Sequence, residues 1–213
     1  MPGVATSLHS AKMSGSTADR SRRLATVFLL LLALVFGAVD QYLGSLSRYA
    51  WAADTSLLAG PWLVFSFLVG CTQRSARRAC VLAVSCTYVA LVGFIVMTLS
   101  PVEHAKVSLV GLLGLLVWQV RWFLLGTVSA VVFGWLGHRW RTGRAVWPTV
   151  VLAATLCLEP IVRHLIGQPT GSAVVRWSEI GVGVAFCLGW FLYRYGGRVA
   201  KIPAARTTSR SGR

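Results

Sequence analysis

The chain has 213 residues, of which 55% are hydrophobic and 13% are charged. A water-soluble domain carries about 25% charged residues, so this composition excludes an ordinary soluble protein. The apolar residues form long blocks without the alternation of barrel strands, and backbone groups in lipid need internal hydrogen-bond partners. The sequence therefore predicts an all-α integral membrane protein.

Six apolar segments are long enough to cross a membrane as helices that rise about 1.5 Å per residue. They cover residues 24–43, 55–72, 79–102, 121–138, 146–165 and 177–195. We therefore expect a six-helix transmembrane domain over residues 23–195. The flanking segments 1–22 and 196–213 are polar and basic, and we expect both to be disordered tails in the cytoplasm.

Residues 107–120 are apolar, but as a helix they reach only about 21 Å, less than a hydrocarbon core of about 30 Å. Gln119 and Arg121 separate them from the next apolar segment. A full span here would give seven helices and would place the next basic cluster outside the cell. We therefore predict a half helix on the outer side at 107–120, either re-entrant or lying on the membrane surface.

Small residues recur along one face of the first and of the last predicted helix. The two stripes consist of Ala33, Gly37 and Gly44 in the first helix and of Gly181, Ala185 and Gly189 in the last. Small side chains let helices approach each other closely in a membrane. We expect both stripes to face other helices of the bundle.

Most of the 21 basic residues lie in four segments, which share one side of the membrane if the six helices alternate in direction. These segments are the two tails, Arg74–Arg78 and Arg139–Arg144. An excess of Lys and Arg is typical of cytoplasmic segments. We therefore expect a multi-pass plasma-membrane protein with both termini in the cytoplasm. The expected partners are anionic inner-leaflet lipids, and not nucleic acid, despite the net charge of +15.

Three of the six acidic residues share one depth on three different helices. Counting from the inner helix ends places Asp40, Glu159 and Glu179 about 20–24 Å up. Ionisable groups inside a membrane usually face the bundle interior or a water-filled cavity. These carboxylates are therefore candidates for a binding site in the outer half of the membrane.

Two helix interruptions are expected at a similar depth, at Gly60-Pro61 and at Pro160, because proline has no N–H to donate. Broken helices with free backbone groups form substrate sites in many transporters. We predict an outward-facing polar pocket, which His164 and Arg176 would complete. Its ligand-binding residues are Asp40, Gln41, Glu103, Arg121, Glu159, Arg163 and Glu179. The alternative is structural, because Glu159 and Arg163 have the spacing of an intrahelical ion pair.

Signatures of catalysis and of cofactor binding are absent from the sequence. It contains no HExxH, GxSxG, Walker A or GxGxxG motif. The four histidines are dispersed, and the five cysteines lie in or at the end of apolar segments without a CxxC pair. We expect no cofactor, no metal site and no disulfide framework.

Several short motifs resemble those of an uncharacterised family of multi-spanning membrane proteins from high-GC (actinobacterial) bacteria. These are the residues from Gly37 to Ser45, Gly60-Pro-Trp62, Ser100-Pro-Val-Glu103, the run from Gly134 to Arg141, and Leu158-Glu-Pro160. The resemblance would cover residues 24–195. The family has a domain of unknown function, so the resemblance implies a membrane fold and no activity.

Three functions fit these observations. The first is a small-solute transporter or the membrane-embedded binding subunit of one, because three carboxylates share a depth with two helix breaks. The second is a non-catalytic accessory or scaffold protein of the cell envelope. The third is an intramembrane enzyme that acts on lipid or envelope precursors, since acid–base chemistry needs only two suitably placed carboxyl groups.

Overall fold

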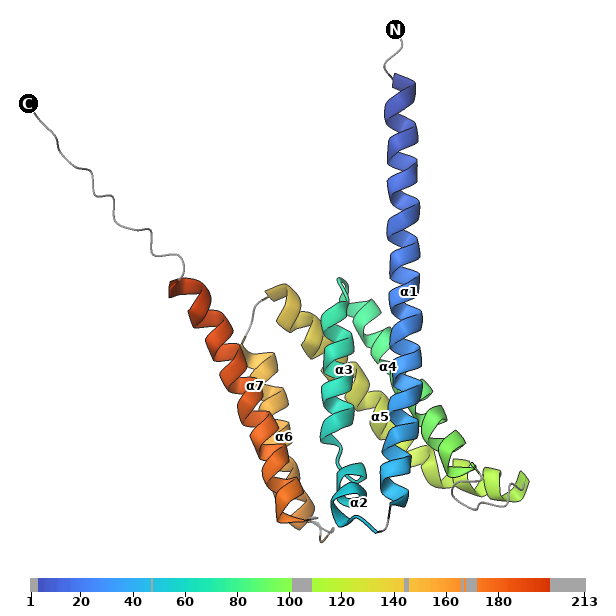
Figure 1. Cartoon of the computed structure of the whole chain (residues 1–213), viewed down its shortest axis with the longest axis vertical. Coiled ribbons are helices and arrows are strands. Elements are labelled where there is room, and N and C mark those ends of the chain that lie inside the picture. Colours follow the sequence, from blue (N-terminus) through green and yellow to red (C-terminus); the bar gives the residue numbers. More distant parts are fainter. Residues whose placement is uncertain are drawn as a thin grey trace, which may run out of the picture.

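The computed structural model describes residues 4–46, 48–100, 109–143, 146–165, 167 and 172–199. These residues form seven α-helices and no strand, which confirms the all-α prediction. The helices are α1 (Val4–Ser45), α2 (Ala50–Ser56), α3 (Gly60–Thr72), α4 (Ala76–Thr98), α5 (Leu109–Gly143), α6 (Trp147–Leu165) and α7 (Ala173–Val199). Figure 1 shows α1 extending well beyond the other helices, and α6 and α7 side by side next to α3.

Four stretches of helix are long and apolar enough to cross a membrane. They are Asp19–Ser45 within α1, Ala76–Thr98, Val120–Gly143 within α5 and Trp147–Leu165. A fifth arises if α2 and α3 count as one span, which is bent by 50° between Ser56 and Gly60. Helix α7 has 27 residues but is not among them, so the described residues support four or five of the six predicted spans.

Two helices, α1 and α5, begin earlier in the chain than the sequence predicts. Residues 109–120 of the expected half helix and the span expected at 121–138 are parts of the single helix α5, so no separate half helix lies there. A charged residue such as Arg121 does not break a helix, because arginine has a high helix propensity and its long side chain reaches away from the axis. Helix α1 begins at Val4, before the predicted start at Leu24. The division into a membrane domain and two tails stays a prediction.

Helices α1 and α4 pack backbone against backbone. A Cβ atom added to Gly37 of α1 would lie 1.8 Å from the carbonyl oxygen of Ala90 in α4. A Cβ added to Gly93 of α4 would lie 2.1 Å from the carbonyl oxygen of Leu34 in α1. The predicted inward face of the first helix is thus confirmed at Ala33 and Gly37, both of which are buried. Gly44, the third member of the stripe, is exposed, although an added Cβ there would lie 2.9 Å from the Ser56 hydroxyl oxygen.

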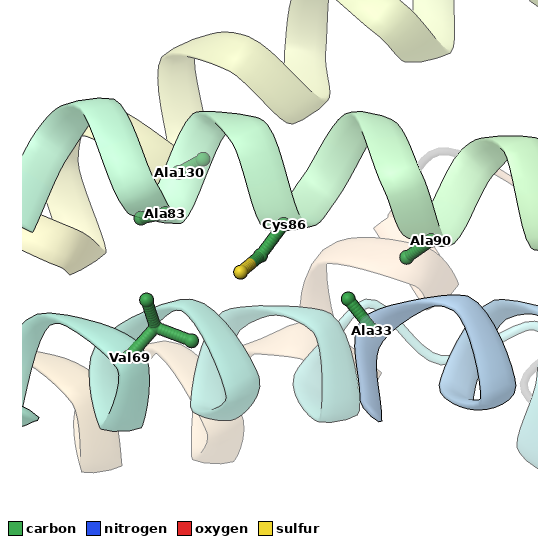
Figure 2. Packing of buried hydrophobic residues seen from close by; sticks show 6 residues of the cluster. All are labelled: Ala33, Val69, Ala83, Cys86, Ala90 and Ala130. Carbon is green, nitrogen blue, oxygen red and sulfur yellow. The ribbon is translucent and has the colours of Figure 1, made fainter. Parts of the chain in front are cut away.

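The same arrangement joins α3 to α5, where a Cβ on Gly137 would lie 2.0 Å from the carbonyl oxygen of Phe67. The buried core around these crossings consists of small side chains, and Figure 2 shows Ala33 and Val69 pointing toward α4. Its members are Ala33, Val69, Ala83, Cys86, Ala90 and Ala130.

Large apolar side chains lie on the outside of these helices. On α1, Leu31 and Val35 are each 57% exposed, whereas Ala33 between them is fully buried. A soluble protein would bury its leucines and valines first. Small residues inside and large apolar residues outside are the pattern expected for helices surrounded by lipid.

The last helix packs with a different face from the one that its small-residue stripe predicts. Gly181, Ala185 and Gly189 are exposed, and an added Cβ on either glycine would meet nothing within 4 Å. The buried face instead carries Glu179 and Gly183, and a Cβ on Gly183 would lie 3.0 Å from the sulfur of Cys157 in α6. The expectation that this stripe faces the bundle is therefore wrong for the described residues.

Side chains of other helices cap both ends of α3. At its C-terminus, Arg141 of α5 donates hydrogen bonds to the carbonyl oxygens of Cys71 and Thr72. A cation is stabilising at this end, because the helix dipole and the free carbonyls there are negative. At its N-terminus, Glu159 of α6 accepts a hydrogen bond from the backbone N–H of Ala59. A helix of 13 residues, about 20 Å long, is thus anchored at both ends.

Candidate functional site

Glu159 lies where α6 meets the bend between α2 and α3. One carboxylate oxygen, Oε1, accepts the N–H of Ala59 at 2.6 Å and pairs with the Arg163 guanidinium at 2.9 Å. The side chains of Glu159 and Arg163 are 10% and 13% exposed. The intrahelical ion pair of the structural interpretation is therefore present. The ion pair also keeps the Glu159 carboxylate, an anion, at the N-terminus of α3, where the helix dipole is positive and stabilises negative charge.

Glu179 of α7, the helix next to α6, reaches the same point and is 6% exposed. A Cβ added to Gly60 would lie 3.2 Å from Glu179 Oε1 and 3.6 Å from Glu159 Oε2. Glycine at position 60 therefore leaves room for both carboxyl groups beside the start of α3. Glu159 Oε2 and Glu179 Oε1 are thus neighbours at one point beside Gly60. We name Glu159 and Glu179 the carboxyl pair.

The facing oxygens of the carboxyl pair are buried without a donor. Neither Glu159 Oε2 nor Glu179 Oε1 has a hydrogen-bond partner among the described residues. Buried polar groups in proteins are nearly always hydrogen-bonded, and an unpaired one generally has a functional or structural reason. The pair therefore has two free acceptor positions for a proton or for a cationic group.

A groove of about 260 Å³ opens beside Glu179, between α2–α3 and α6–α7. Its lining is largely apolar and includes the two hydroxyl residues Thr55 and Ser178. The lining residues are Thr55, Leu58, Gly60, Pro61, Val64, Leu156, Ser178, Glu179 and Val182. A second groove of about 260 Å³ lies between α6 and α7, where His164 and Arg176 are brought together at Pro160. The interruption predicted at Pro160 is wrong, because helix α6 continues through this proline to Leu165.

Asp40, the third predicted carboxylate, has a partner of its own. It is 7% exposed, and its Oδ2 accepts a hydrogen bond of 3.3 Å from the indole N–H of Trp62. The Trp62 ring also packs edge-on against Phe36 at 5.1 Å between centroids. Asp40 therefore ties α1 to α3, whereas the carboxyl pair joins α6, α7 and the start of α3.

Replacing Trp62 with phenylalanine is expected to lower the free energy of unfolding by about 0.6–1.7 kcal/mol, the range for a hydrogen bond between membrane helices. The aromatic contact with Phe36 is retained, while Asp40 loses its donor. Thermal unfolding in a mild detergent measures the change. Trp51→Phe is the control, because Trp51 is 55% exposed, and it should unfold like the unmodified protein. Equal unfolding of both variants would contradict a structural role for the Asp40–Trp62 bond.

Two further predicted site residues, Gln41 and Arg121, are not brought to the carboxyl pair. Gln41 is half-buried on α1, and Arg121 is exposed on α5 with its guanidinium over the Trp122 ring. Glu103 lies outside the described residues.

The sequence reasoning missed Asp54 of α2, whose carboxylate accepts the backbone N–H of Ser172 directly before α7. Ser172 also accepts the N–H of Val175, the pattern of a helix N-cap. A serine before an apolar segment was the signal for this helix start.

Comparisons of the chain with protein-family models, with curated proteins and with solved structures found no match. The resemblance to the uncharacterised family of multi-spanning proteins therefore stays a prediction. The function has to be argued from the geometry of the carboxyl pair.

Proposed function

We propose that this protein binds a small cationic solute at the carboxyl pair and moves it across the plasma membrane, alone or as the binding subunit of a transporter. The observation that carries the proposal is the pair of buried, unpaired carboxyl oxygens beside the bent α2–α3 segment. Burying a charged group inside a membrane bundle is energetically unfavourable, so such groups usually have a function.

The charges at the site favour a cation as the ligand. Two carboxyl groups face one guanidinium, that of Arg163, so the ionised cluster has a net charge of −1. The groove beside Glu179 adds apolar surface and the hydroxyl groups of Thr55 and Ser178. An organic ammonium ion fits this site, because its N–H groups can donate to the carboxylates while its apolar part contacts the apolar lining of the groove.

The bend between α2 and α3 gives the site a part that can move. Residues 57–59 interrupt the helix, and Glu159 holds the break through the Ala59 N–H. Discontinuous helices whose ends point at the substrate occur in many transporters. A ligand that draws Glu159 away from Ala59 would release the connection between α2 and α3 from α6, so binding and helix movement are linked.

The proposed topology has six spans, with α2–α3 as the bent second span and α7 as the sixth, and both termini in the cytoplasm. Figure 1 supports this topology. The upper half of α1, the α3–α4 connection and the C-terminal ends of α5 and α7 all lie at one end of the bundle. Arg74, Arg77 and Arg141 belong to these segments. A cytoplasmic face at this end would satisfy the positive-inside rule and would contact anionic lipids.

The proposal is tested with a panel of small amines, which includes methylamine and benzylamine, on the protein in proteoliposomes. We expect saturable uptake of at least one radiolabelled amine by the unmodified protein, and uptake lowered at least about tenfold in Glu179→Gln, because a buried carboxylate contact to a cation contributes more than about 1.4 kcal/mol. Asp54→Asn is the matched control and should transport normally, since Asp54 is engaged with Ser172. Uptake that is equal in all three proteins, or absent throughout the panel, would contradict the proposal.

A further inference from the structure

The two facing carboxyl oxygens cannot satisfy each other while both groups are ionised. An ionised carboxylate has only acceptors, so Glu159 Oε2 and Glu179 Oε1 are then two acceptors without a donor. Like charges at such close range also repel strongly where the dielectric constant is low. A single proton removes both problems, because it turns one group into a donor and lowers the charge.

We infer that Glu159 and Glu179 share one bound proton, held between Glu159 Oε2 and Glu179 Oε1, and that this proton is the ion exchanged for the solute. The inference rests on the proposed function for the exchange, and on the geometry of the carboxyl pair for the proton. Pairs of carboxyl groups in contact elsewhere also share one proton, because both cannot ionise together.

The groups around the pair leave one negative charge to be neutralised. Arg163 of α6 pairs with Glu159 through Oε1 and so balances one carboxylate. The N-terminus of α3 contributes only the partial positive charge of its dipole. From α2, Asp54 adds no cation and is engaged with Ser172, while His164 and Arg176 line the other groove. A proton on the second carboxyl group makes the described cluster neutral.

The exchange balances in atoms and in charge. When an ammonium group enters from the groove, the O–H bond of the shared proton breaks and the proton leaves to water. The N–H groups of the ammonium then donate to Glu159 Oε2 and Glu179 Oε1 in its place. One positive charge replaces another, so the pair holds either a proton or a solute and never both. This mutual exclusion is what couples two opposed fluxes in an exchanger.

Infrared spectroscopy of the full-length protein in lipid nanodiscs tests the shared proton without any solute. Neutral carboxyl groups absorb in a separate C=O band, which shifts in heavy water. We expect this band in the unmodified protein at about pH 7, and we expect both Glu159→Gln and Glu179→Gln to lose the same component of it. In each variant the glutamine amide donates to the facing oxygen, which leaves the remaining carboxylate ionised. Both variants therefore keep a hydrogen-bonded pair and should fold, as circular dichroism will show.

The control is Asp54→Asn, which should keep the whole band because Asp54 accepts a backbone N–H outside the pair. A band that is the same in the unmodified protein and in both glutamine variants would overturn the shared proton. Amine uptake that still depends on Glu179 would then leave the proposed function standing without proton exchange. A lost band without any amine uptake would instead contradict the proposed solute and retain the proton site.

Discussion

Replacing Gly37 with alanine is expected to force α1 and α4 apart and to lower the free energy of unfolding by at least about 2 kcal/mol, as overpacking does in a close-packed core. The new Cβ atom would lie 1.8 Å from the carbonyl oxygen of Ala90 and 2.9 Å from its Cα atom. These are backbone atoms, so no side-chain rotation relieves the clash. Thermal unfolding and gel filtration in the same mild detergent measure the effect.

Gly181→Ala is the matched control, because Gly181 is also a helix glycine but has nothing within 4 Å of an added Cβ. Alanine is a better helix former than glycine by about 1 kcal/mol, so this variant should be as stable as the unmodified protein or slightly more stable. If both alanine variants unfolded at the same temperature, the close crossing of α1 and α4 would be contradicted.

Replacing Glu159 with alanine is expected to lower the free energy of unfolding by about 3–5 kcal/mol, the range for breaking a buried ion pair from one side. Arg163 is 13% exposed and would keep its charge without its partner, and the N–H of Ala59 would lose its acceptor. The start of α3 and helix α6 would both be affected. The measurement is thermal unfolding of the purified variant, compared with the unmodified protein.

Glu159→Gln separates the carboxylate's charge from its hydrogen bonds. The glutamine oxygen still accepts the Ala59 N–H, and its amide takes the place of the shared proton as the donor to Glu179 Oε1, which no other described side chain reaches. We expect this variant to lose less stability than Glu159→Ala, because the amide donor keeps Glu179 ionised and the Glu179 carboxylate then balances the charge of Arg163. If both variants were destabilised equally, the ion pair with Arg163 would itself hold the bundle together. The structural interpretation of the site would then be preferred.

Hydropathy and small residues predicted the helical class and the inward face of the first helix. The break before Gly60 also follows from the sequence, because a helix that contains Pro61 is most stable with the proline in its first turn. The continuity of α5 could not be predicted from apolar length, since an arginine between two apolar runs interrupts hydropathy but not backbone hydrogen bonding.

The sequence predicts the depth of the acidic residues but not which of them come together. Counting 1.5 Å per residue gives the height of a side chain in the bundle but not the direction in which it points. The sequence therefore places Asp40, Glu159 and Glu179 at one level, but only Glu159 and Glu179 lie beside the same residue, Gly60. Asp40 instead accepts a hydrogen bond from Trp62, and neither the sequence spacing nor the depth indicates that contact.

The inward face of α7 could have been found from Glu179. A buried glutamate in an apolar helix indicates the side that faces the protein, and Gly183 one turn later shares that side. The stripe of Gly181, Ala185 and Gly189 has the same four-residue period but lies on another face. Small residues alone do not distinguish a helix contact from a lipid-facing surface.

The caps of α3 have a consequence for how the protein is made. The ribosome delivers α3 before α5 and α6, so its first N–H group and its last carbonyl groups enter the membrane before Glu159 and Arg141 exist. Free backbone groups in hydrocarbon are unfavourable by several kcal/mol each, and about 20 Å of helix is short for a span. In the proposed topology, the second span would therefore be made early but would reach its final depth late, once the fourth and fifth spans have been inserted beside it.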